Sequence, residues 1–91
     1  MKWIKLFESF ENEWPIVDGR LEKEFEFKDF SEALVFINEL ARICEQQNHH
    51  PEINWVYNKV RLNLSTHDAN DTITEKDLKL SKTIDEILKG I

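Results

Sequence analysis

The chain contains only two glycines, and the first of them predicts a tight turn early in the sequence. Gly19 follows Asp18, and this pair is favoured in two-residue hairpin turns because both residues can adopt a positive φ. The turn would join a strand in residues 14–17 to a second strand in residues 21–27. In the second segment apolar and charged side chains mostly alternate, so one face can pack on a core while the other faces water. The sequence therefore predicts an antiparallel hairpin.

A long amphipathic helix is predicted after this hairpin. Asp29 and Glu32 have the three-residue spacing of a capping box, so the helix should begin near Phe30. Apolar residues then follow helical periodicity as far as about Asn48, and Pro51 prevents much further extension. The residues expected on the buried face are Phe30, Ala33, Leu34, Ile37, Leu40, Ala41 and Cys44.

A second hairpin is predicted by the alternation of apolar and polar residues in segments 53–57 and 60–64. Asn58 and Lys59 separate the two segments and are expected to form the turn. Trp55 and Tyr57 are both expected to pack on the sheet, because the alternation alone accounts for aromatic residues at these positions.

The last predicted element is a helix that starts at Thr74. Asp77 occupies the reciprocal position of a capping box. Capping alone explains an acidic residue at this position, so we expect a structural role for Asp77 rather than a catalytic one. The apolar stripe of this helix consists of Leu80, Ile84, Ile87, Leu88 and Ile91.

These elements follow one another as two strands, a helix, two strands and a helix. This order packs as an α+β fold, in which a four-stranded antiparallel sheet of two hairpins carries both long helices on one face. The stretch before the first strand favours a short amino-terminal helix on the same face, although the alternation of Trp3, Lys5 and Phe7 leaves a strand open. Because 91 residues are too few for two ordinary cores, we expect one domain that spans residues 1–91.

The charge balance disfavours several classes of partner. The chain has 18 acidic residues against 12 basic ones, and the net charge of -6 repels nucleic acid and anionic lipid. No apolar run reaches membrane length, and the amino terminus lacks the apolar region of a signal peptide. The lone Cys44 falls in the helical apolar pattern, where a buried reduced thiol is the ordinary interpretation. We therefore expect a cytoplasmic protein with no nucleic acid or membrane partner.

All three histidines lie between residues 49 and 67, close to the ends of predicted elements. His49 and His50 follow the first long helix, and His67 follows the strand that closes the second hairpin. A neutral imidazole accepts a proton and an imidazolium donates one near neutral pH, so such a set can catalyse an elimination without a metal or an organic cofactor. Glu45 lies one helical turn before His49 and could orient its imidazole.

A zinc site is the alternative interpretation of the same residues, because three histidine ligands and a water form a known catalytic arrangement. The neighbouring residues His49 and His50 would have difficulty in coordinating one ion together. We therefore favour an acid-base site without a metal.

The histidines belong to a pattern of four spaced parts. These parts are Glu45-Gln46-Gln47-Asn48-His49-His50-Pro51, Tyr57-Asn58-Lys59-Val60, Leu64-Ser65-Thr66-His67 and Asp77. In order and spacing the pattern resembles the signature of the pterin-4a-carbinolamine dehydratase family, and the resemblance extends over roughly residues 14–88. A signature of several spaced parts is more specific than a short isolated motif.

By this resemblance, the chain is expected to remove water from a 4a-hydroxytetrahydropterin. The product would be a quinonoid dihydropterin, in the step that recycles tetrahydrobiopterin after the hydroxylation of aromatic amino acids. The resemblance implies a hydro-lyase that uses no cofactor. It assigns His50 and His67 to proton transfer, with His49 in the catalytic set chiefly as a residue that binds and orients the pterin. Glu45 and Pro51 complete the substrate-binding set, Pro51 through its effect on the chain conformation.

The resemblance also implies self-association, as a homodimer or a homotetramer. Some relatives act as coactivators or assembly factors, so a non-catalytic binding partner on the same fold is the alternative function. The intact set of histidines favours the enzyme. Residues 68–71 depart from the family pattern because they lack the glycines that relatives often carry there, although Asn and Asp tolerate left-handed conformations. The amino-terminal helix of longer relatives is expected to be shortened or absent.

Overall fold

The computed structural model of the chain describes residues 14–90, which form four strands, two long helices and a short 3-10 turn. In chain order the elements are β1 (Ile16–Val17), β2 (Arg20–Glu26), α1 (Phe30–Gln47), β3 (Glu52–Val56), β4 (Lys59–Leu64), η2 (His67–Ala69) and α2 (Glu75–Lys89). The predicted α+β order is confirmed. The short amino-terminal helix of the prediction falls in residues 1–13, which lie outside the described residues.

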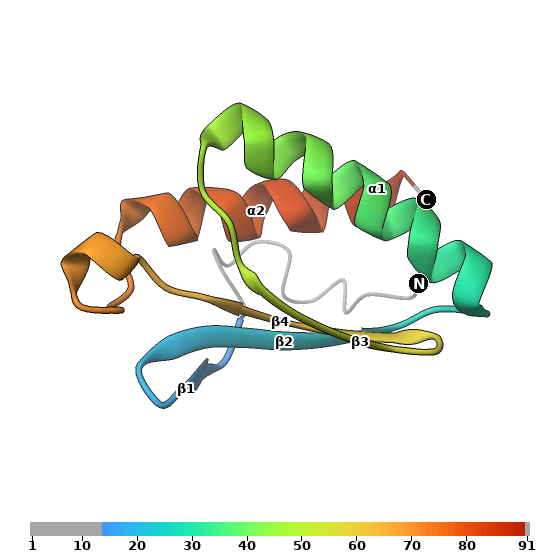
Figure 1. Cartoon of the computed structure of the whole chain (residues 1–91), viewed down its shortest axis with the longest axis horizontal. Coiled ribbons are helices and arrows are strands. Elements are labelled where there is room, and N and C mark those ends of the chain that lie inside the picture. Colours follow the sequence, from blue (N-terminus) through green and yellow to red (C-terminus); the bar gives the residue numbers. More distant parts are fainter. Residues whose placement is uncertain (1–13, 91) are drawn as a thin grey trace.

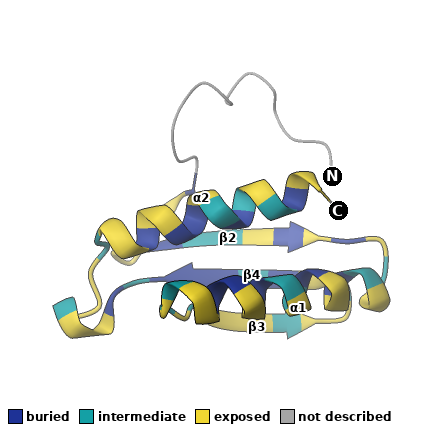
Figure 2. Cartoon of the chain, turned by 90° about the horizontal axis from the view of Figure 1, so that it is seen from above, coloured by how far each residue is buried: buried dark blue, intermediate teal, exposed yellow. Residues whose placement is uncertain are grey.

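The described strands form one antiparallel sheet in the order β1-β2-β4-β3, and α1 and α2 both lie on the same face of this sheet (Figure 1). At the centre, β2 and β4 pair in a register that places Leu21 opposite Leu64 and Phe25 opposite Val60. The edge strand β3 is largely exposed, whereas most residues of β4 are buried (Figure 2). The core therefore lies between the two central strands and the helices.

The first hairpin turns at Asp18 and Gly19 as predicted, with φ values of 53° and 78°. The strand before this turn is shorter than predicted, because only the two residues of β1 pair with β2. Trp14 instead lies in the core, where its ring meets that of Phe25 edge-on with 5.7 Å between the centroids. The burial of this large ring fixes the point at which the chain joins the sheet.

The turn of the second hairpin lies one residue earlier than predicted. Its turn residues are Tyr57 and Asn58, whereas Lys59, which we expected in the turn, already pairs with Val56 in the sheet. The prediction was wrong because Tyr57 adopts a left-handed φ of 53°, which is uncommon for a bulky residue. Its side chain was expected to pack on the sheet but is 61% exposed in the turn. Asn58 stabilises the arrangement, since its Nδ2 donates to the carbonyl of Phe27 at 2.7 Å and its own carbonyl accepts the N–H of Phe27 at 2.8 Å.

Both helices begin at the predicted caps. At the start of α1, Asp29 Oδ1 accepts the backbone N–H of Glu32 at 2.9 Å. At the start of α2, Thr74 and Asp77 form the reciprocal capping box. Such bonds satisfy N–H groups that have no partner within the helix. In the predicted stripe of α2, Ile87 is half-buried, Ile91 lies outside the described residues, and the buried members are Leu80, Ile84 and Leu88.

The buried face of α1 differs in part from the predicted one. Phe30, Leu34 and Ala41 were expected in the core but are exposed. Phe36 and Ile43, which the prediction omitted, are buried in the core. Apolar side chains occupy two adjacent stripes of this helix, so helical periodicity alone does not decide which stripe faces the core. The apolar stripe of α1 that stays exposed consists of Phe30, Leu34, Val35 and Ala41.

Aromatic rings connect the sheet to α1 within the core. The ring of Phe36 lies 5.5 Å from that of Phe25 and 5.2 Å from that of Phe27, measured between centroids. Contacts at this spacing add to the stability that burial itself provides. Neither helix in the described part of the chain combines the length and the apolar character needed to cross a membrane.

The single cysteine lies in the core, as predicted. Burial raises the pKa of the Cys44 thiol to about 11, and the negative charge of the neighbouring Glu45 adds to the increase. Only the thiolate is a good nucleophile, so this thiol stays protonated and unreactive near neutral pH.

We expect Cys44 of the folded protein to be alkylated by iodoacetamide at pH 8 roughly 100-fold more slowly than an exposed thiol, because two pKa units reduce the thiolate fraction by about that factor. A time course followed by intact mass spectrometry measures the rate. The same chain in guanidinium chloride is the control and should react at the ordinary rate. Equal rates in the folded and unfolded chain would contradict the raised pKa.

Replacing Gly19 by Ala is expected to lower the free energy of unfolding by about 1 kcal/mol, because a side chain at a positive φ is strained even in open space. Gly90→Ala is the matched control, since the added Cβ would meet only the carbonyl oxygen of Ile87 at an ordinary 3.7 Å. Urea unfolding measures both variants. Equal losses would show that the left-handed turn does not limit substitution at Gly19.

Candidate active site

The carboxyl end of α1 places the first two histidines in different surroundings. Asn48 ends the helix in a left-handed conformation with a φ of 53°. The next residue folds back, since the N–H of His49 donates to the carbonyl of Cys44 at 3.1 Å. The side chain of His49 is only 11% exposed, whereas that of His50 is 57% exposed. The left-handed cap thus directs one imidazole into the protein and the next toward solvent.

A fully buried carboxylate, that of Asp77, holds the imidazole of His49. Oδ1 of Asp77 lies 2.6 Å from Nε2 of His49. Oδ2 accepts the hydroxyl of Thr66 at 2.7 Å and the N–H of Thr74 at 2.9 Å. Asp77 caps α2 as predicted, but it also contacts a site histidine, which the sequence interpretation did not anticipate.

The contact with Asp77 determines which nitrogen of His49 donates a hydrogen bond. An ionised carboxylate only accepts hydrogen bonds, so Nε2 of His49 is the donor in the bond to Asp77. In the neutral imidazole the other nitrogen, Nδ1, is then the free acceptor. His49 can therefore accept a proton or a hydrogen bond through one defined atom.

Glu45 pairs with His50 and not with His49, contrary to the expectation. Oε2 of Glu45 lies 2.8 Å from Nε2 of His50. The expected pairing assumed that the helix continued to residue 49, but the left-handed Asn48 ends the regular spacing before that residue. Both side chains are largely exposed, so solvent screens their attraction.

His67 is the first residue of η2 and is almost fully exposed. Its Nδ1 lies 3.6 Å from Oδ1 of Asp71, a distance too long for a hydrogen bond but close enough for electrostatic attraction. Asn70 and Asp71 both take a left-handed φ, of 60° and 58°. This loop thus forms its turns with Asn and Asp where the family pattern has glycine.

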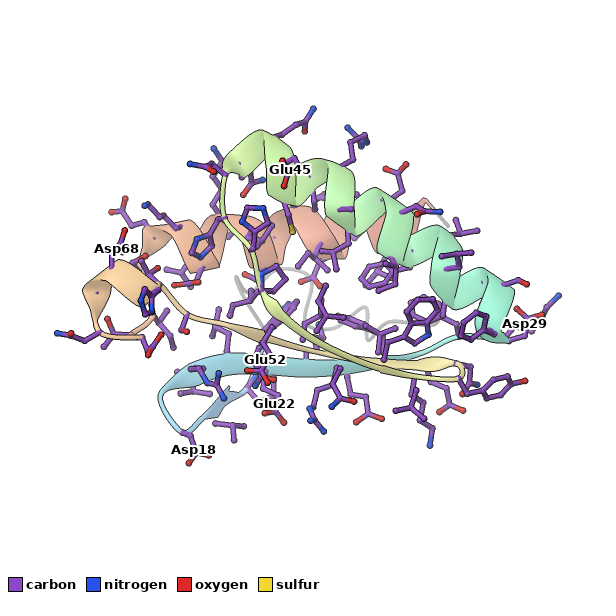
Figure 3. All side chains as sticks on the ribbon, in the orientation of Figure 1. Asp18, Glu22, Asp29, Glu45, Glu52 and Asp68 are labelled. Atoms are coloured by element: carbon purple, nitrogen blue, oxygen red, sulfur yellow. The ribbon has the colours of Figure 1, made fainter. Side chains whose placement is uncertain are left out.

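The carboxyl end of α1 and the loop η2, from which the three histidines come, lie toward the same end of the molecule (Figure 1), but the histidines do not bond to one another within residues 14–90. Figure 3 shows this end: Glu45, the partner of His50, lies at the carboxyl end of α1, and Asp68 marks the loop that carries His67. Thr66 links the two regions. It directly precedes His67, and its hydroxyl donates to the carboxylate of Asp77, which holds His49.

Each histidine has its own acidic neighbour. His49 faces Asp77, His50 faces Glu45, and the third imidazole lies beside the carboxylate of Asp71. Within residues 14–90, no three His, Cys, Asp or Glu side chains gather closely enough to hold a single metal ion. Separate imidazole and carboxylate pairs can donate and accept protons at several points around a bound molecule.

Pro51 joins this end of α1 to β3. It is half-buried and lies immediately before the first residue of the strand. A proline restricts the residue before it to extended conformations, so Pro51 limits the directions that His50 can take. Pro51 therefore restricts the chain conformation between His50 and β3.

Sequence reasoning missed two residues of this region, Asp77 as a partner of His49 and Thr66 as a partner of Asp77. Both belong to the family pattern, and this was the only signal that pointed to them. Neither contact follows a local spacing rule, because the bonded residues are 28 and 11 positions apart in the chain.

A curated protein of Picosynechococcus sp. that carries the name pterin-4-alpha-carbinolamine dehydratase is 45% identical to this chain over 75 residues. The matched region covers 82% of this chain and 80% of the relative. The match therefore extends over most of both sequences.

Two solved structures have a similar fold. The crystal structure of a transcriptional coactivator/pterin dehydratase from Brucella melitensis matches with a TM-score of 0.77 and 35% identity, over 91% of this chain and 89% of that one. A pterin dehydratase-like protein identified as a RuBisCO assembly factor in the alpha-carboxysome matches with a TM-score of 0.70, over 82% of this chain and 88% of that one. At 22% identity, the second match shows a shared fold alone.

The family model for pterin 4 alpha carbinolamine dehydratase matches residues 4–87, which is nearly the whole chain. The resemblance inferred from the histidine pattern is confirmed by this match and by the named relative. The chain belongs to the pterin 4 alpha carbinolamine dehydratase family, a family of hydro-lyases.

Proposed function

We propose that this protein dehydrates a 4a-hydroxytetrahydropterin to a quinonoid dihydropterin and water, in tetrahydrobiopterin recycling. The observation that carries the proposal is the set of three imidazole and carboxylate pairs at one end of the molecule, one of them buried. Membership of the dehydratase family supports the same reaction class.

The proposed reaction needs two proton transfers and no change in oxidation state. The bond between C4a and the hydroxyl oxygen breaks, and the hydroxyl takes up a proton to leave as water. N5 loses its proton, and its electron pair forms the new double bond to C4a. A histidine set can supply one proton and accept the other without a metal or an organic cofactor.

The exposure of the histidines supports a division of roles. His50 and His67 are exposed, so they can reach a bound molecule and exchange protons with water, and we assign proton transfer to them. His49 is held in one orientation by Asp77, which suits a residue that binds and orients the pterin. Glu45 acts on the site through His50, and Pro51 restricts the chain between the histidines and β3.

Purified protein is expected to accelerate the ultraviolet change that accompanies dehydration of chemically generated 4a-hydroxytetrahydropterin. His50→Ala and His67→Ala should each lower kcat by about 100-fold or more, because each removes a proton carrier. Lys82→Ala, at an exposed position of α2, is the matched control and should keep the wild-type rate.

Both histidine side chains are exposed, so their variants should melt at the wild-type temperature, which separates lost chemistry from lost folding. Full activity in both variants would end the proposed mechanism. Protein dialysed against a chelator should remain fully active, and loss of activity restored by zinc would favour a metal site instead.

A binding role is a second candidate, and the exposed apolar stripe on α1 favours it. Phe30, Leu34 and Val35 are between 42% and 51% exposed. The similar Brucella protein is described as a transcriptional coactivator as well as a pterin dehydratase. A protein that binds a partner while lacking any dehydratase activity would support this function over the first.

We also propose that the chain self-associates, as a homodimer or a homotetramer, through its exposed apolar surface. The edge strand β3 contributes Ile53 and Val56, which are 45% and 67% exposed, and its outer edge pairs with no strand in residues 14–90. Exposed apolar surface beside an open strand edge is a common site of association.

Light scattering at micromolar concentration is expected to give a mass of at least twice 10.9 kDa. Val35→Glu should shift the mass toward the monomer, because a charge would be placed within the apolar stripe. Lys82→Glu, which adds negative charge at an exposed position of α2 outside the apolar stripe, is the control. A monomeric mass for the unaltered protein would contradict self-association.

A further inference from the structure

We propose that Thr66 is a positioning residue that fixes the orientation of the Asp77 carboxylate against His49 and holds the loop that carries His67. The inference rests on the proposed function for its effect on catalysis, but not for its effect on the imidazole. Thr66 is only 6% exposed, and both its side chain and its backbone bond to the site.

The hydroxyl of Thr66 lies in a chain of hydrogen bonds whose direction is determined. Its single proton is donated to Oδ2 of Asp77 at 2.7 Å, because a carboxylate cannot donate. The hydroxyl of Thr74, 2.6 Å away, must then donate to the oxygen of Thr66. Oγ1 of Thr74 in turn accepts the N–H of Lys76 at 3.3 Å. The donors therefore point from the start of α2 toward Asp77.

These hydrogen bonds occupy one oxygen of Asp77 and leave the other oxygen for His49. Oδ2 of Asp77 receives the donors of Thr66 and Thr74, so the second oxygen, Oδ1, is presented to His49 as an acceptor. Two donors on one oxygen also limit rotation of the carboxylate group. With Oδ1 fixed in place, the imidazole gains most by donating from Nε2, and Nδ1 is left as the free nitrogen.

The backbone of Thr66 anchors the loop of His67. Its N–H donates to the carbonyl of Thr72 at 2.8 Å. Its carbonyl accepts the N–H groups of Ala69 and Asp71, each at 3.0 Å. A shift of Thr66 would therefore move the loop and the carboxylate together, so one residue couples the positions of two site histidines.

Thr66→Val keeps the shape of the side chain and replaces the hydroxyl by a methyl group. It is expected to lower kcat about 10-fold, as is usual when a supporting hydrogen bond to a site residue is lost. The pH profile of kcat should change as well, because the carboxylate that faces His49 would be held less firmly and its bond to Nε2 would weaken. Thr66→Ser, which keeps the hydroxyl, should restore the rate and the profile.

The matched control is Thr83→Val, which removes a hydroxyl from α2 at a position that bonds to Gln47 and to the carbonyl of Lys79. It should alter neither kcat nor the nitrogen-15 spectrum of the His49 ring. A merely structural effect of replacing a threonine would appear in both variants, whereas a positioning effect appears only at Thr66.

Nitrogen-15 spectra of the histidine rings test the proposal independently of activity. In the wild-type protein neutral His49 should carry its proton on Nε2, and in Thr66→Val the Nε2 resonance should shift because the bond to Asp77 is weaker. An Nδ1 proton in the wild type would overturn the proposal even if the variant failed to fold, and so would unchanged spectra and kcat in a folded variant. A wild-type protein that shows the expected tautomer but no dehydratase activity would refute the proposed function and not the role of Thr66.

Discussion

The buried carboxylate of Asp77 is the interaction on which this end of the molecule depends. Its bonds reach three segments of the chain: the residues after α1 through His49, the loop after β4 through Thr66, and the start of α2 through Thr74. Leaving a buried charge without partners costs several kcal/mol, typically about 3–5 when one member of a pair is removed. The three segments therefore depend on the same carboxylate, and the residue that caps α2 also holds His49.

The other two histidines pair with carboxylates that are exposed to solvent rather than buried. The pairs of His50 with Glu45 and of His67 with Asp71 are largely exposed, and exposed ion pairs contribute about 0–1 kcal/mol. These imidazoles are consequently free to exchange one partner for another at little cost. A site with one fixed imidazole and two exposed ones can hold a substrate in place and still exchange protons with water.

Much of the fold could be predicted because its decisive signals are local. Asp18-Gly19, the cap at Asp29 and the capping box of α2 each act within a few residues, and all three appear in the structure as predicted. The errors arose where packing decides. Tyr57 accepts a left-handed φ to keep β3 and β4 in register, and α1 buries Phe36 because the sheet lies beneath that stripe. No local pattern contains this information.

The site could be predicted in its residues but not in its connections. Glu45 and His49 were paired by a helical spacing rule, and the rule failed because Asn48 ends the helix one residue too early. Asp77 was explained fully by capping, and a sufficient local explanation concealed a bond that spans 28 positions. A carboxylate has two oxygens, and a cap uses only one of them. A capping acid that the fold buries completely is therefore expected to have further partners elsewhere in the chain, and here those partners are His49 and Thr66.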